Sequence, residues 1–296
     1  MTRYDHFMGR LAAGEAILID GATGTECDRR GVPLLENAWN GGAAVSHPDI
    51  VRQIHRDYLA AGAEIVISNT FGTSLHALTA AGVGADFELY NRQAVQLAVE
   101  ARVAEGADGA LVAGGISYWS WIAEEPELDD LRASIATQAA IMRDAGADLL
   151  MLEMMVGIPR MITTLEAALS SGLPVWVGLS CKPSAAGAMC LYDGEPLQDA
   201  LAALKDRGVP LVSIMHTQVP YVDDCLKVMA AHWDRHSGVY AHTSTEDRDK
   251  RWIFQDAISP EGYAAEAKGW LNRGVQIIGG CCGIGTEHIS ALREIV

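Results

Sequence analysis

The sequence is poor in basic residues and has no long apolar run. Lys and Arg number 22 against 38 Asp and Glu, and the formal net charge is −16 at pH 7. This balance argues against nucleic acid or an anionic membrane as the main partner, because both attract basic surfaces. No stretch reaches the roughly 18 consecutive apolar residues of a membrane-spanning helix. We therefore expect no nucleic-acid and no membrane partner, and we attribute the acidity to solubility.

A secretory leader and a disulfide framework are also absent from the pattern. The first six residues, Met1-Thr2-Arg3-Tyr4-Asp5-His6, are polar and no long apolar run follows them. The six cysteines of this long chain are therefore expected to be thiols or metal ligands, in a cytoplasmic protein. No linker rich in Pro, Gly or Ser divides the chain, so we expect residues 1–296 to form a single domain. The sequence gives no oligomeric state.

A glycine followed closely by a short apolar run recurs eight times. Glycine commonly ends helices, and apolar runs without alternation suit parallel strands that are buried on both faces. Amphipathic stretches separate the runs, most clearly at 48–59. Eight strand–helix units predict an α/β fold, a (β/α)8 TIM barrel, with a doubly wound open sheet as the alternative. The runs are 16–20, 65–69, 110–114, 149–153, 175–179, 211–214, 239–241 and 275–278, after Gly14, Gly62, Gly106, Gly146, Gly172, Gly208, Gly238 and Gly274.

Polar residues follow these runs, at the end of the strands where a barrel carries its active site. A carboxylate after a run as apolar as 149–152 costs several kcal/mol to bury without a partner, which singles out Glu153. Several of the others are expected to be ordinary loop residues. The set is Asp20, Asn69, Gly115, Glu153, Cys181, His216, His242 and Cys281-Cys282.

The pair Cys281-Cys282 lies between glycines, in Gly279-Gly280-Cys281-Cys282-Gly283. Successive side chains of a regular strand point to opposite sides, but a bend that glycine permits can aim both thiols at one point. A soft metal such as zinc suits that point. The alternatives are two small core residues or a vicinal disulfide. We favour the metal, because core packing needs no glycine on both sides.

The segment 20–26, Asp-Gly-Ala-Thr-Gly-Thr-Glu, together with the Gly-Gly-Cys-Cys-Gly tail, resembles the homocysteine S-methyltransferase family. Matching segments at 47–58, 61–64, 69–71, 147–153, 175–181 and 193–197 extend the resemblance over nearly the whole chain. The resemblance implies a (β/α)8 barrel that binds Zn2+ through three protein cysteines. The thiol of the substrate then completes the tetrahedron.

One family ligand differs in this chain. Two of the family cysteines match Cys281 and Cys282, whereas His216 takes the position of the third. Histidine is a sound zinc ligand, so the implied site is His216, Cys281 and Cys282. One imidazole and two thiolates make a neutral zinc site, at which a thiol ionises more readily but attacks more weakly. Alternatively, His216 is a hydrogen-bonded loop residue and not a ligand. Cys190 or Cys225 would then be the third ligand.

The resemblance also implies a substrate site. Asp20 and Glu153 would hold the ammonium group of a homocysteine-like acceptor, and the backbone amides of Gly21 and Ala22 would receive its carboxylate. Asn69 belongs to the same predicted site. No protein group beyond the metal-activated substrate thiol is assigned a catalytic role.

The predicted function is a zinc-dependent S-methyltransferase that moves a methyl group from an onium donor, such as S-methylmethionine or S-adenosylmethionine, to that thiol. One alternative is a zinc hydrolase or lyase that uses metal-bound water, with His242 or Glu153 as the general base. Another is a non-catalytic binding barrel. Aromatic side chains are candidates to face the onium methyl group, Trp119 first among them. The full set is Trp39, Tyr118, Trp119 and Trp121.

Overall fold

The computed structural model describes residues 2–120, 125–243, 245–246, 252–253 and 258–296. Its main sheet has eight parallel strands in the order β1-β12-β9-β8-β5-β4-β3-β2. A parallel bridge between Ile19 and Ile65 joins the two end strands. The sheet therefore closes into a barrel, which confirms the (β/α)8 prediction and excludes the open sheet. The strands are β1 (Ile17–Leu18), β2 (Ile65–Ile67), β3 (Leu111–Ile116), β4 (Leu149–Met155), β5 (Val175–Leu179), β8 (Leu211–Gln218), β9 (His236–His242) and β12 (Ile277–Gly280).

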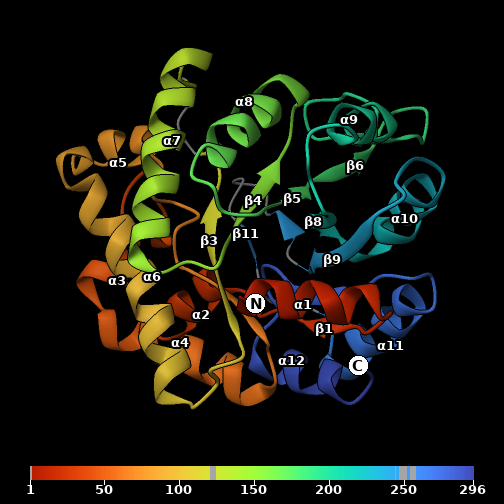
Figure 1. Ribbon diagram of the computed structural model, residues 1–296, viewed down its shortest axis with the longest axis horizontal. Helices are drawn as coiled ribbons and strands as arrows, with labels where there is room; N and C mark the ends of the chain where they lie inside the picture. Colours follow the sequence, from red (N-terminus) through yellow and green to blue (C-terminus); the bar gives the residue numbers. More distant parts are fainter. Residues whose placement is uncertain (1, 121–124, 244, 247–251, 254–257) are drawn as a thin grey trace.

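Helices on the outside connect successive strands (Figure 1). The predicted helix at 48–59 is confirmed as α4, which buries Val51, Ile54 and Tyr58 against the barrel. The helices after β1 are α2 (Thr23–Arg29), α3 (Ala43–Ser46), α4 (Pro48–Ala61), α5 (Leu75–Ala80), α6 (Phe87–Ala104), α7 (Leu128–Ala145), α8 (Ile158–Leu169), α9 (Leu197–Leu204), α10 (Val219–His232), α11 (Pro260–Leu271) and α12 (Thr286–Arg293). Two short antiparallel strand pairs lie outside the main sheet, β6 (Cys181–Pro183) with β7 (Met189–Leu191) and β10 (Thr245–Glu246) with β11 (Trp252–Ile253). None of the helices described is long and apolar enough to cross a membrane.

An additional helix, α1 (Arg3–Ala12), covers the end of the barrel at which the strands begin (Figure 1). Its Phe7 and Leu11 belong to the apolar cluster inside the barrel. Trp176, also inside the barrel, donates a hydrogen bond from Nε1 to the hydroxyl of Tyr4 at 3.0 Å. With this end closed, the opposite end, where the strands finish, is the one that can receive a ligand.

The prediction that all eight glycines end helices is wrong for one of them. Gly238 lies inside β9, paired with Ser213 on one side and Ile277 on the other. A Cβ at this position would overlap the hydroxyl of Ser213, so glycine is required here by close strand packing. The other seven adopt the left-handed conformation, with φ between 62° and 115°. These are Gly14, Gly62, Gly106, Gly146, Gly172, Gly208 and Gly274.

His55 on α4 is a buried histidine outside the barrel mouth. It is fully buried, and neither ring nitrogen has a hydrogen-bond partner among the described residues. Burial disfavours the imidazolium and lowers the pKa of His55 to about 4. The unfolded chain, in which a histidine has a pKa near 6.5, therefore binds a proton at mildly acidic pH that the folded protein excludes.

We expect the free energy of unfolding to decrease as the pH falls from about 6.5 to 4, by on the order of 3 kcal/mol from His55 alone. The variant His55→Leu removes this titration and should flatten that part of the profile. The measurement is denaturant unfolding at several pH values, with the exposed His6→Leu as the control. Equal pH slopes for the wild type and His55→Leu would contradict the assignment.

Candidate metal and substrate site

A pocket opens at the carboxyl ends of the strands, opposite α1. Six of the predicted site residues line it, and they come from the last residues of β4 and β8 and from the segments that follow β1, β2 and β12. Tyr240 of β9 and the aromatic residues Trp39 and Phe71 contribute further walls. The barrel thus brings together residues more than 250 positions apart in the sequence. The six are Ala22, Asn69, Glu153, His216, Cys281 and Cys282.

His216, Cys281 and Cys282 form a compact set of nitrogen and sulfur atoms. Their potential ligand atoms all lie within 4.8 Å of one another. The Sγ atom of Cys281 lies 3.0 Å from Nδ1 of His216, and the two Sγ atoms are 3.5 Å apart. Two ligand atoms on a tetrahedral zinc lie about 3.3–3.8 Å apart, given bonds of 2.0–2.3 Å. The separation of the two sulfur atoms falls in this range, whereas the 3.0 Å between Sγ of Cys281 and Nδ1 of His216 is a shorter, hydrogen-bond distance. The donor types suit a zinc ion.

Irregular backbone aims two of the polar side chains at this set. His216 has φ 49° and Met154, next to Glu153, has φ 54°. The register shifts at these places, between Leu152 and Met155 in β4 and between Met215 and Gln218 in β8. Such bulges redirect side chains, and a positive φ is uncommon for residues other than glycine. Strain of this kind concentrates at functional sites.

The glycines around the cysteine pair have two different functions. Gly279 and Gly280 lie in β12, where a Cβ would meet Ile19 or Ile284 at 2.5 Å. Gly283, with φ 89°, forms the turn after the pair. The expected bend is therefore produced after the cysteines, whereas the glycines before them allow close packing.

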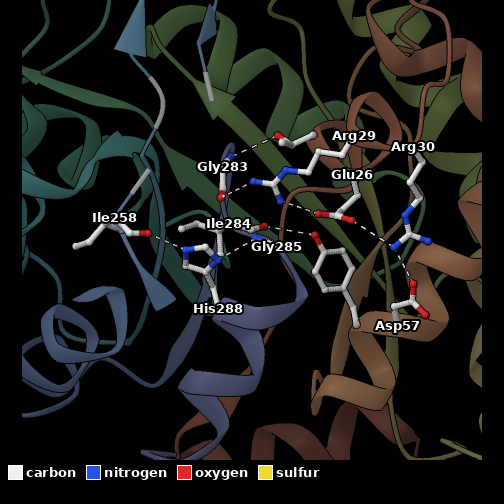
Figure 2. A network of polar contacts seen from close by, with 11 residues as sticks. Glu26, Arg29, Arg30, Asp57, Ile258, Gly283, Ile284, Gly285 and His288 are labelled. Atoms are coloured by element: carbon white, nitrogen blue, oxygen red, sulfur yellow. Dashed lines mark hydrogen bonds and ion pairs between the residues drawn. The ribbon is translucent and has the colours of Figure 1, made fainter. Parts of the chain in front are cut away.

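Helices α2 and α4 hold the loop that follows the cysteine pair (Figure 2). Arg29 donates to the carbonyl of Gly283 at 3.3 Å, and the amide of Gly283 donates to the hydroxyl of Thr25 at 3.4 Å. The hydroxyl of Tyr58 donates to the carbonyl of Ile284 at 3.4 Å. The loop is therefore fixed from two directions, which limits the positions open to the two thiols.

Figure 2 also shows how Arg29 is oriented. The carboxylate of Glu26, which is largely buried, accepts from Arg29 at 2.8 Å and from Arg30 at 3.3 Å. Arg30 in turn donates to Asp57 on α4 at 2.7 Å. These ion pairs join α2 to α4 beneath the loop, and each buried charge has a partner of opposite sign.

The protonation states of the set are strongly shifted by proximity. A hydrogen bond from the Cys281 thiol, helped by the nearby His216, lowers the pKa of Cys282 to about 5. Burial raises the pKa of Cys281 well above its usual value. Burial alone would lower the pKa of His216, but Cys282 and Glu153 outweigh it and raise that pKa to about 9. A thiolate beside two further donors is a ready ligand for a soft cation.

Asp20 is not one of the residues that line the pocket, but it contacts two residues that do, Ile67 and Tyr240. Its carboxylate is fully buried, accepts from the amide of Ile67 at 2.8 Å and lies 3.4 Å from the hydroxyl of Tyr240. Burial raises the pKa of Asp20 well above its usual range, and the nearby Glu153 adds to the effect. A cation bound above it would favour ionisation of this carboxyl.

The predicted role for the amide of Ala22 is wrong. That amide donates to the carbonyl of Ile284 at 2.9 Å, so it is not available for a substrate carboxylate. Gly21 is enclosed, since a Cβ there would lie 2.7 Å from the ring of Tyr58. Asn69 lines the pocket, and its side-chain amide donates to the carbonyl of Asn40 at 3.0 Å.

Among the aromatic candidates, Trp39 lines the pocket and Trp119 does not. The ring of Trp119 contacts Phe71, with centroids 6.2 Å apart. Phe71 lines the pocket and stacks on His216 at 5.2 Å with an interplanar angle of 27°, a contact that sequence analysis missed. Tyr118 is buried and hydrogen-bonded to the backbone of 156–157, and Trp121 lies outside the described residues.

The alternative ligands and the alternative base lie elsewhere. Cys225 is buried on α10, beside Cys181, where its thiol raises the pKa of Cys181. Cys190 lies on β7, with its sulfur 3.7 Å from the carbonyl of Ala188. His242 does not line the pocket, and burial lowers its pKa to about 3. In the part of the chain that the structure describes, the metal-type cluster is His216, Cys281 and Cys282.

The structure is thus a closed (β/α)8 barrel that carries one imidazole and two cysteine side chains at the carboxyl ends of its strands. The sequence profile described as Homocysteine S-methyltransferase matches residues 17–296, so the chain belongs to the homocysteine S-methyltransferase family.

Relatives of similar length support this assignment. Homocysteine S-methyltransferase 1 of Zea mays is 25% identical over 315 residues, which cover 96% of this chain and 95% of the relative. Homocysteine S-methyltransferase YbgG of Bacillus subtilis (strain 168) is 25% identical over 303 residues, 93% of each chain. Selenocysteine Se-methyltransferase of Brassica oleracea var. italica is 22% identical over 314 residues, 95% of this chain and 89% of the relative. The metallated crystal structure of the homocysteine methyltransferase MmuM from Escherichia coli shares the fold, with a TM-score of 0.78, 24% identity, and coverage of 95% of this chain and 96% of that one.

Proposed function

We propose that this protein is a zinc-dependent methyltransferase that moves a methyl group from a sulfonium donor to the thiol of homocysteine or a close analogue. The observation that carries the proposal is the set of His216, Cys281 and Cys282 among the residues that line the pocket, with Glu153 beside His216. Membership of the family supports the acceptor, and the names of the relatives include both sulfur and selenium acceptors.

Each part of the pocket has a role in this proposal. His216, Cys281 and Cys282 hold the zinc ion, which when bound would lower the pKa of the acceptor thiol so that the thiolate is present at neutral pH. Glu153 holds the acceptor ammonium, and Asp20, beneath it, adds negative charge once ionised. Trp39 and Phe71 give the donor an aromatic wall.

The donor is proposed from the chemistry of this wall. A sulfonium carries a positive charge on a largely apolar group, which an aromatic face stabilises without forming a covalent bond. Trp39 and Phe71 meet edge to face, with centroids 6.2 Å apart. In the transfer, the bond from the methyl carbon to the donor sulfur breaks as the bond to the acceptor sulfur forms, and the donor leaves as a neutral thioether.

The zinc hydrolase or lyase is less well supported. It requires a general base beside the metal. His242 is a poor candidate, because its pKa is lowered to about 3 and it does not line the pocket. Glu153 is the remaining candidate, and its proposed contacts are with the ammonium and with His216.

A matrix of donors and acceptors tests the proposed function. We expect the zinc-loaded protein to convert homocysteine to methionine with S-methylmethionine or S-adenosylmethionine as the methyl donor. The reaction is followed by the mass of the product. Selenocysteine and cysteine serve as alternative acceptors, and a reaction without any thiol serves as the control for hydrolysis of the donor. Donor breakdown that is independent of the thiol would favour the hydrolase.

A further inference from the structure

Glu153 has a second neighbour besides the proposed substrate. Its Oε2 lies 3.8 Å from Nε2 of His216, within ion-pair distance, and both side chains are about nine-tenths buried. The other ring nitrogen, Nδ1, lies 3.0 Å from Sγ of Cys281. The thiol is therefore nearer to Nδ1, since Nε2 lies 3.6 Å from the same sulfur, and the carboxylate is within ion-pair distance of Nε2. A cysteine at position 216 could not form this arrangement, because its only polar side-chain atom is the sulfur that would bind the metal.

We propose that Glu153 is a positioning residue that orients His216 as a metal ligand, in addition to its contact with the acceptor. A histidine that binds a metal usually donates its other ring N–H to a carboxylate or carbonyl, which fixes the tautomer and makes the ligand more basic. Removal of such a partner typically weakens metal binding 10- to 100-fold. This inference depends on the proposed zinc site.

The sheet itself holds the carboxylate in this place. Oε1 of Glu153 occupies the space above Gly115 on β3, where a Cβ would overlap it. Ile67 and Thr70 close the same space, at 2.9 and 3.3 Å from that Cβ position. With Oε1 confined there, Oε2 is the oxygen that faces His216. The absence of a side chain at Gly115 therefore leaves the space that the Glu153 carboxylate occupies.

The imidazole is fixed on its face as well as at its edges. Phe71 stacks on the ring, and the backbone of His216 adopts φ 49° at a bulge. A ring held by stacking, by a thiol and by a carboxylate has little freedom to rotate. The consequence is that binding of the acceptor ammonium and orientation of a metal ligand depend on the same carboxylate.

A double-mutant cycle tests this inference through metal affinity. Zinc affinity is measured by competition with a chromophoric chelator for the wild type, Glu153→Gln and Glu153→Ala, each also combined with His216→Cys. With His216 present we expect affinity to fall in the order wild type, Glu153→Gln, Glu153→Ala, by about 10- to 100-fold in total. In the His216→Cys background the loss should be smaller by about tenfold, because only the field of the carboxylate then acts on the metal. Spectra of the Co2+-substituted proteins should change with Glu153 only when His216 is present.

Two further variants keep the test decisive. Gly115→Ala displaces the carboxylate without replacing Glu153, and it should weaken zinc binding more when His216 is present than in the His216→Cys background. Glu195→Gln alters a partly buried carboxylate that bonds the amide of Ile158, outside the pocket, and should leave zinc affinity unchanged. Equal losses in the two backgrounds would overturn the positioning role and leave the zinc site intact. Absence of zinc binding by the wild type would instead remove the proposed metal site.

Discussion

Replacing both Cys281 and Cys282 with serine is expected to abolish zinc binding and methyl transfer together. The two sulfur atoms are two of the three donors in the cluster, and a serine hydroxyl is a poor ligand for zinc at neutral pH. Zinc content, measured by elemental analysis of protein purified without chelator, should fall from about one ion per chain to near zero. Cys281 belongs to the smaller apolar cluster inside the barrel, and Cys282 packs against it. Serine is close to cysteine in size, and the larger apolar cluster contains neither residue, so the metal-free variant should still fold.

The variant Cys190→Ser provides the matched control. Cys190 is also buried, its sulfur lies near a carbonyl that a hydroxyl can reach, and it is outside the pocket. It should retain zinc and activity. Full zinc occupancy in the Cys281→Ser/Cys282→Ser variant would refute the metal assignment, whereas loss of zinc in Cys190→Ser as well would point to a general effect of thiol removal.

Replacing His216 should have two different results according to the new residue. His216→Ala removes a donor and should weaken zinc binding by on the order of 100-fold, since apparent zinc affinities of about 10–16 kcal/mol are shared among roughly four ligands. His216→Cys should retain zinc, because thiolate and imidazole bind it at about 2.3 and 2.0–2.1 Å. It also makes the site more negative by one unit, so the pKa of the acceptor thiol should rise and its thiolate should attack faster.

The pH dependence of single-turnover methyl transfer measures both effects of His216→Cys. The apparent pKa of the rate should move upward relative to the wild type, and the plateau rate at high pH should increase. A His216→Ala variant that keeps wild-type zinc affinity and activity would show that His216 is not a ligand. The metal site would then need a different third donor.

The barrel was predictable from the sequence because its strands are buried on both faces. A strand such as 175–179 is apolar at nearly every position, and the glycine at 172 ends the preceding helix in the left-handed conformation. Gly238 has the same appearance in the sequence but serves close strand packing, which depends on Ser213 far away in the chain. The pattern of glycines therefore predicts the architecture better than it predicts the role of each glycine.

The grouping of His216, Cys281 and Cys282 was predictable from the sequence, whereas the details of their surroundings were not. The cysteine pair carries a local signal, whereas the backbone at Met154 and His216 adopts a conformation that neither residue type favours. The stacking of Phe71 on His216 and the use of the Ala22 amide by Ile284 arise only from the closure of the barrel. No local pattern in the sequence encodes contacts of this range.

Transfer of an isotopically labelled methyl group is the most direct test of the proposed function. The zinc-loaded wild type is mixed with homocysteine and S-methylmethionine or S-adenosylmethionine that carries a trideuterated methyl on sulfur, and the products are analysed by mass spectrometry. We predict methionine with all three deuterium atoms on its methyl group, and no labelled product with the Cys281→Ser/Cys282→Ser variant. Labelled methionine formed equally well by that variant, or no labelled methionine from the zinc-loaded wild type with either donor, would contradict the account.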